Sequence, residues 1–179
     1  RDLTPRPVPQ APHRVTRCYV SLRPPPEVVE TVAAVRGGEV DRLGWSDPDD
    51  YHVTLRFYPD VDRDRLVEAV QTLEHPPVDV AGGPSVQEMF DLVVALPISG
   101  ADDLVATLAE ATSNLSPLDL AFRGHLTVGR FLADAARSFD PRPLSVAWRA
   151  ESVIVVESIP RGGRHDHVDL AEVPLAGVG

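Results

Sequence analysis

Lysine is absent from the sequence, so all 17 basic residues are arginines, and 27 acidic residues bring the net charge to −10. A protein that holds long nucleic acid through its phosphates needs positive charge on the surface that binds. The overall charge therefore excludes a general attraction for nucleic acid. Only a localised arginine patch could bind phosphate groups.

Cysteine and long apolar runs are also scarce. The single cysteine, Cys18, cannot form an internal disulfide, and its place in a short apolar run predicts a buried thiol. Such a chain suits a reducing compartment, so we expect a cytoplasmic protein. No apolar run approaches the roughly 20 residues that a membrane helix needs, and we expect no membrane partner.

The 179 residues are 43% hydrophobic and 25% charged, which is typical of a folded domain. Residues 1–14 contain four prolines and almost no large apolar side chain, which predicts a flexible arm without a role in the fold. Residues 15–179 are predicted to form one domain with two lobes.

Hydrophobic periodicity predicts the order of the helices and strands. A unit of strand, helix and histidine-bearing strand occurs twice, and two further strands close the chain. The predicted strands span 17–22, 51–58, 90–98, 121–131, 152–158 and 167–175, and the predicted helices span 27–36, 64–73 and 101–115. Pro59 is expected to end the second strand. This order predicts an α+β fold of two pseudo-symmetric lobes, each an antiparallel or mixed sheet with packed helices.

The two histidine-bearing strands share the pattern His-apolar-Thr-apolar. It begins at His52 in the first half and at His125 in the second, so Thr54 and Thr127 follow two residues later. With six His and eight Thr, chance predicts about 0.27 His-x-Thr pairs, so two pairs in matching contexts indicate function. Because side chains alternate along a strand, each His and its Thr project from one face together.

This combination of side chains suits the chemistry of a phosphodiester. Hydrolysis needs a base to deprotonate water and an acid to protonate the departing oxygen, and histidine, with an ordinary pKa of about 6.5, can fill either role. Threonine hydroxyls can donate hydrogen bonds to the non-bridging phosphate oxygens.

The chain resembles the 2H phosphoesterase superfamily, and within it the RNA 2',3'-cyclic phosphodiesterases, also called 2'-5' RNA ligases. The similarity runs from RCYVSLRPPPEVVETV through HVTLRF, FDLVVALP and GHLTVGRF to VIVVESIPRGGRHDHVDLAEVPL, and so covers about residues 17–175. The resemblance implies a bilobal fold in which the two His-x-Thr motifs face each other across a central groove.

The resemblance also implies an activity, which is the opening of a 2',3'-cyclic phosphate to a 2'-phosphate without a metal or other cofactor. His52 and His125 would be the acid and base, in an order that the sequence does not give, and Thr54 and Thr127 would hold the phosphate. The reverse reaction would join ends through a 2'-5' link. We expect a monomer whose partners are RNA 3' ends or small nucleotides that carry a cyclic phosphate.

Four more residues are candidate substrate contacts. Arg130 corresponds to an arginine that helps to bind phosphate in the family, although strict alternation points it away from the His125 face unless the strand has a bulge. Arg56 and Arg123 fall on the histidine faces by alternation. His167 stands where the family commonly has an aromatic residue, and it could stack on a base.

Three alternatives stay open. His165, Asp166, His167 and Asp169 could bind a divalent metal, although their place beside a Gly-Gly turn is typical of an ordinary polar surface. A module that binds nucleotides or RNA ends without catalysis could keep the same groove. A 2H enzyme could also act on another small cyclic phosphate or on a 2'-5' diester.

Overall fold

The structure is a computed structural model, and it describes residues 15–38, 40, 42–115, 120–132 and 138–177. The proline-rich segment 1–14, for which we predicted a flexible arm, lies outside these ranges. Within them the chain forms three α-helices, α1 (Pro26–Ala33), α2 (Arg63–Gln71) and α3 (Asp102–Ala111), and one 3-10 turn, η1 (Pro48–Asp50). No described helix has the length and apolar character needed to cross a membrane.

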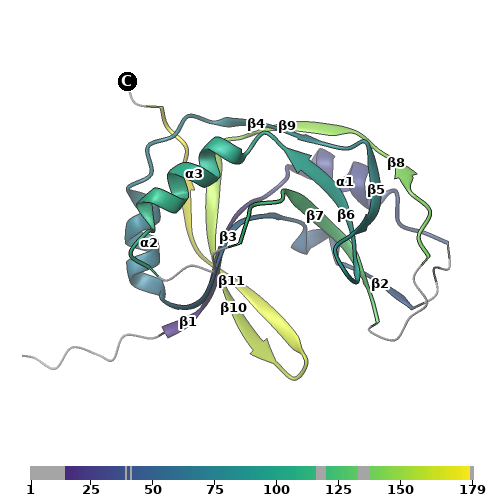
Figure 1. Ribbon diagram of the computed structural model, residues 1–179, viewed down its shortest axis with the longest axis horizontal. Coiled ribbons are helices and arrows are strands. Elements are labelled where there is room, and N and C mark those ends of the chain that lie inside the picture. The colour runs from purple at the N-terminus through teal and green to yellow at the C-terminus, as the bar shows by residue number, and fades with distance from the viewer. Residues whose placement is uncertain (1–14, 39, 41, 116–119, 133–137, 178–179) are drawn as a thin grey trace, which may run out of the picture.

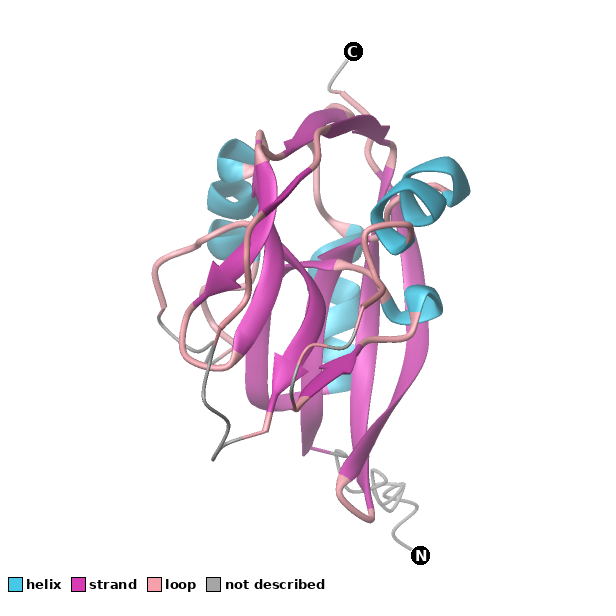
Figure 2. Ribbon diagram, turned by 90° about the vertical axis from the view of Figure 1, so that its right-hand side faces the viewer, coloured by secondary structure: helices cyan, strands magenta, loops and turns pink. Residues whose placement is uncertain are grey.

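The strands of the described ranges lie before, between and after these helices in the chain (Figures 1 and 2). They are β1 (Val15–Leu22), β2 (Leu43–Trp45), β3 (Val53–Asp62), β4 (Val78–Gly82), β5 (Ser85–Met89), β6 (Val93–Ser99), β7 (His125–Phe131), β8 (Arg142–Pro143), β9 (Val146–Ala150), β10 (Ser152–Arg161) and β11 (Arg164–Pro174). The three predicted helices and six predicted strands are present, with shifted ends. The short strands β2, β4, β5, β8 and β9 were not predicted.

Antiparallel pairing links most strands into the order β11-β10-β1-β3-β7-β6-β4-β9. Strands from the two halves of the chain meet at β3 and β7, where Val53 pairs with Leu126. The predicted α+β fold is therefore confirmed, and the two histidine-bearing strands are direct neighbours at the centre of this order.

One face of β1 shows how the core is built. Cys18, Val20 and Leu22 are fully buried and belong to the main hydrophobic core. Helices α2 and α3 lie next to each other and contribute Leu66 and Leu104 to the same core (Figure 1). Each such side chain contributes roughly 1.5–3 kcal/mol on burial. On the opposite face of β1, Tyr19 belongs to a separate small cluster with Ile154 and Val156.

Pro59 does not end the second predicted strand, so that prediction is wrong. Strand β3 continues to Asp62, and its register against β1 shifts between the pairs Thr16–Val61 and Cys18–Tyr58. At this shift, two residues of β3 lie opposite a single residue of β1. A bulge tolerates proline because the extra residue is left out of the hydrogen-bond ladder.

The buried Cys18 thiol gives a direct test of this core. Burial, and secondarily the Glu157 carboxylate, raises the pKa of Cys18 to about 12. Because only the thiolate is nucleophilic, we expect a disulfide reagent such as DTNB to leave the native protein unmodified at pH 8 and to label Cys18 fully in denaturant. Rapid, stoichiometric labelling of the native protein would contradict this packing.

Candidate functional site

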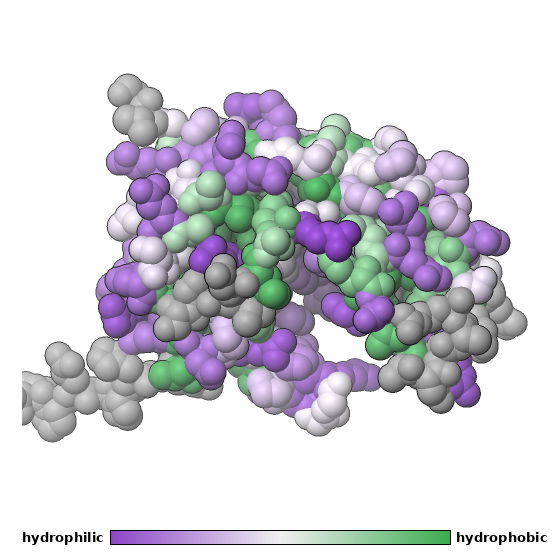
Figure 3. Space-filling model, in the orientation of Figure 1, coloured by the Kyte–Doolittle hydropathy of each residue, from purple (hydrophilic) through white to green (hydrophobic). Residues whose placement is uncertain are grey.

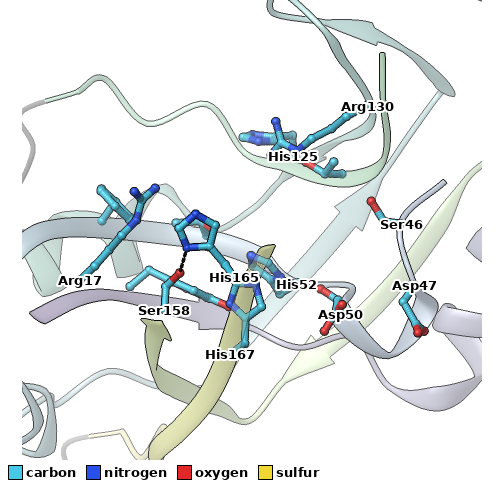
Figure 4. A pocket seen from close by; sticks show the side chains of 14 residues that line it. Arg17, Ser46, Asp47, Asp50, His52, His125, Arg130, Ser158, His165 and His167 are labelled. Atoms are coloured by element: carbon cyan, nitrogen blue, oxygen red, sulfur yellow. Dashed lines mark hydrogen bonds between the residues drawn. The ribbon is translucent and has the colours of Figure 1, made fainter. Parts of the chain in front are cut away.

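A cavity of about 580 Å³ lies beside the centre of the strand order. Strands β1, β3 and β7 contribute to it, and the β10–β11 hairpin forms one wall (Figure 4). In the space-filling view a hollow bordered mainly by hydrophilic residues opens above this hairpin (Figure 3). Six of the eight residues predicted from sequence line the cavity, namely His52, Thr54, His125, Thr127, Arg130 and His167.

The pairing of β3 with β7 brings the two motifs together. Val53 and Leu126, the apolar residues between each His and Thr, face each other and are fully buried. In antiparallel strands the flanking positions then pair crosswise, so that each His lies across from the Thr of the other motif. The two imidazoles and the two hydroxyls therefore share one face.

Both histidine rings are oriented by the same backbone contact. The Nδ1 atom of His52 lies 2.7 Å from the carbonyl oxygen of Asp50, and the Nδ1 atom of His125 lies 2.7 Å from that of Arg123. Because a carbonyl can only accept, each Nδ1 carries the proton. The Nε2 atom of each ring, which has no hydrogen-bond partner among the described residues, is left to act as base or acid.

The turn before His52 fixes the carbonyl that orients its ring. The side chain of Asp47 accepts a hydrogen bond from the backbone N–H of Asp49 at 3.0 Å and caps η1, which ends at Asp50. Asp and Asn side chains favour this local contact with their own backbone. The sequence SDPDDYH thus orients His52 through local contacts between neighbouring residues.

The aromatic ring of Tyr19 packs against the imidazole of His52. Its ring stacks on the imidazole with centroids 4.9 Å apart, and its hydroxyl is hydrogen-bonded to Nδ1 of His167 at 2.9 Å. Burial raises the pKa of Tyr19 to about 12, so the hydroxyl stays protonated. Burial also lowers the pKa of His52, with the nearby His167 adding to the effect, and the neutral imidazole is favoured.

Bulges follow both motifs at the same position. The β1–β3 register shifts where Leu55 is an extra residue on β3, directly after Thr54. The β6–β7 register shifts in the same way at Val128, directly after Thr127. An extra residue reverses the alternation of the side chains beyond it.

This reversal determines which side chains line the same cavity as the histidines. Phe57 and Arg130, each three residues after its Thr, line the cavity. The bulge that Arg130 requires is thus present. Strict alternation is wrong for Arg56, which lines a neighbouring pocket together with Arg123 and does not line the cavity.

Arg17 and Tyr19 are among the lining residues that the sequence analysis missed. The guanidinium of Arg17 lies 4.7 Å from the ring centroid of Phe57, and with Arg130 it supplies positive charge to the cavity. Neither arginine forms an ion pair within the described part of the chain. Alternation against the buried Cys18 could have placed Arg17 and Tyr19 on the site face. The lining of the cavity thus combines the two arginines Arg17 and Arg130 with the two aspartates Asp47 and Asp50.

The residues of the suggested metal cluster contact separate partners. Within the described ranges, no three His, Cys, Asp or Glu side chains are placed to hold a metal ion. The four contacts are His165 with Ser158 at 3.1 Å, His167 with Tyr19 at 2.9 Å, Asp166 with Arg161 at 2.8 Å, and Asp169 with Arg23 at 2.8 Å.

The lowered pKa of His52 predicts how stability changes with pH. The unfolded chain takes up a proton at its ordinary pKa of about 6.5, whereas the folded chain resists protonation to a lower pH. The contribution of His52 to the free energy of unfolding is thus fully present above about pH 6.5. It is lost as the pH falls towards the pKa of His52 in the folded state. In denaturant titrations, His52→Gln should therefore lose less stability than wild type between about pH 7 and pH 5.

A His75→Gln variant controls for the loss of one ionisable group outside the cavity. Identical pH dependence in wild type and His52→Gln would contradict the burial of this imidazole.

No protein-family description and no curated protein sequence matches this chain. Solved structures do match. E. coli LigT complexed with 3'-AMP aligns with a TM-score of 0.75 at 19% identity, over 90% of this chain and 99% of LigT. TT0787 of Thermus thermophilus aligns with a TM-score of 0.74 at 19% identity, over 90% and 99% of the two chains. The PDE domain of MHV ns2 aligns more distantly, with a TM-score of 0.56 at 11% identity, over 79% and 99%. The chain therefore has the α+β fold of E. coli LigT.

Proposed function

We propose that this protein is a metal-independent 2H phosphoesterase that opens a 2',3'-cyclic phosphate to a 2'-phosphate. The observation that carries the proposal is the matched pair of histidines. Both donate Nδ1–H to the carbonyl two residues earlier, and both line one cavity together with two threonines. Two imidazoles with free Nε2 atoms are the parts that concerted acid and base catalysis needs.

In the proposed reaction each of the two imidazoles transfers one proton. One imidazole takes a proton from water as the water oxygen bonds to phosphorus, and the other donates a proton to the 3' oxygen as its bond to phosphorus breaks. Thr54, Thr127 and Arg130 donate hydrogen bonds to the non-bridging oxygens and stabilise the charge that develops there. In the ligation a 5' hydroxyl attacks phosphorus in place of water, the 3' oxygen leaves with the proton from the acid, and a 2'-5' link forms.

The distribution of charge supports a small substrate. The net charge of −10 repels long RNA, whereas in the cavity Arg17 and Arg130 stand beside Asp47 and Asp50 and give a phosphate two cationic partners. Nucleotides also fit the likeness in fold, because E. coli LigT is known in complexes with 3'-AMP, ATP, NADP+ and phosphate. We propose RNA 3' ends or small nucleotides as substrates, and a cytoplasmic monomer in which residues 15–179 form one domain of two lobes.

The test is hydrolysis of a nucleoside 2',3'-cyclic phosphate in excess EDTA. Wild type should release the 2'-phosphate, and His52→Ala and His125→Ala should each lower kcat by about 10²–10⁴-fold, the usual contribution of acid or base catalysis. Chromatography that separates the 2'- and 3'-phosphates measures both rate and product.

Leu132→Ala is the matched control, because this exposed side chain lines neither the cavity nor the neighbouring pocket. Substrate binding without turnover would support a binding module instead. Turnover that EDTA abolishes and zinc restores would support a metalloenzyme.

A further inference from the structure

Arg142 joins two segments that are far apart in the chain. Its guanidinium donates hydrogen bonds to the carbonyl oxygens of Val35 and Gly37, just after α1, the second at 3.0 Å. It also lies against two aromatic rings, with Cζ 5.4 Å from the ring centroid of Trp45 and 5.0 Å from that of Phe139. A flat guanidinium suits this place because it can donate hydrogen bonds in its plane and stack on rings with its faces. The side chain therefore connects β8 with the segment between α1 and β2.

The strand that Arg142 contacts has little other support. Trp45 is the last residue of β2, which is three residues long, and among the described strands β2 pairs only with β7. A pairing of two strands is marginal by itself, and one this short is weaker still. Trp45 also meets the ring of Phe139 edge to face, with centroids 6.1 Å apart. The contacts with Arg142 and Phe139 therefore give β2 a second attachment.

Strand β2 lies beside the part of β7 that carries Arg130. Gly44 pairs with Arg130, and the N–H of Ser46 donates a hydrogen bond to the carbonyl oxygen of Val128 at 2.9 Å. Val128 is the extra residue of the bulge, which the register with β6 leaves unpaired. The two strands lie close together there, since a Cβ atom at Gly129 would be 3.1 Å from the carbonyl oxygen of Gly44. The bulge that turns Arg130 into the cavity is thus held from the side of β2.

Arg142 closes a ring of contacts around this part of β7. Strand β7 pairs with β6 on one side and with β2 on the other, and β6 pairs with β5, which pairs with β8. Arg142 belongs to β8 and contacts Trp45 of β2, so the two flanks of Arg130 are joined at one end of the molecule (Figure 1). The N–H of Phe139 donates a hydrogen bond to Oε1 of Glu88 in β5 at 2.9 Å and strengthens the same junction. In a closed ring β2 cannot move away from β7 without breaking the contact with Arg142.

We propose that Arg142 is a positioning residue for Arg130, because it holds β2 against the bulge and so keeps the Arg130 guanidinium within reach of a phosphate. This inference rests on the proposed function, in which Arg130 donates hydrogen bonds to the non-bridging oxygens. Arg142 itself does not line the cavity, and it acts only through the backbone that carries Arg130. A misplacement of about 1 Å, caused by a change outside a site, can lower a rate by about 100-fold.

The test is a double-mutant cycle on the affinity for inorganic phosphate, measured by NMR titration of wild type, Arg142→Leu, Arg130→Gln and the double variant. Arg130→Gln should weaken phosphate binding by about tenfold or more, which is the scale of a hydrogen bond to a charged group. Arg142→Leu should weaken it by about threefold or more when Arg130 is present. In the Arg130→Gln background the same change should weaken it no further, because a residue that acts through another is not additive with it.

Arg149→Leu is the matched control, because Arg149 is an exposed arginine whose ion pair with Asp79 lies outside the cavity. It should leave the affinity for phosphate unchanged. Arg142→Lys keeps the charge but not the planar fork, so its affinity should fall between those of wild type and Arg142→Leu, and it carries the same cycle if the leucine variant does not fold. An equal loss of affinity in both backgrounds would overturn the proposal. So would a lowered melting temperature of Arg142→Leu with unchanged affinity, or a wild type that does not bind phosphate.

The cycle also separates this inference from the proposed catalysis, because it measures binding and not turnover. Coupling between Arg142 and Arg130 in a protein that leaves a 2',3'-cyclic phosphate intact in EDTA would support the positioning role and contradict the proposed activity. Hydrolysis of the cyclic phosphate by wild type, together with an additive cycle, would do the reverse.

Discussion

The site depends on one pairing of strands, in which Val53 of β3 faces Leu126 of β7. Both residues are fully buried, so the register between the strands is held by the core and not by the polar groups beside it. A slip of one strand by one residue would send its apolar side chain to the solvent and its histidine inward, so that the two imidazoles would no longer share a face. The same burial that stabilises the fold therefore holds the two imidazoles on one face of the strand pair.

Local contacts then orient the side chains that the strand pairing brings together. The carbonyls of Asp50 and Arg123 select the Nδ1–H tautomer of the two histidines, and a bulge after each motif turns one more side chain into the cavity. That side chain is Arg130 in one motif and Phe57 in the other. The two halves thus repeat the same bulge while differing in the side chain that it turns into the cavity.

Much of this arrangement could be predicted from the sequence. Periodicity and the repeated pattern identified His52 and His125 and the order of the elements, because both signals are local. The bulge that redirected Arg56 could not be predicted, since it depends on the register against another strand. Arg17 was missed for a different reason. The predicted burial of Cys18 already placed Arg17 on the opposite face of its strand, and this alternation was not applied to the search for site residues.

Long-range ¹⁵N–¹H spectra of the histidine rings test the central claim most directly. The account predicts that His52 and His125, when neutral, both carry the proton on Nδ1, and that inorganic phosphate shifts the Nε2 signals of both. His75, which also contacts a backbone carbonyl through Nδ1 but lies outside the cavity, should not respond. Protons on Nε2, or a response to phosphate from only one of the two rings, would contradict a shared site built from a matched pair.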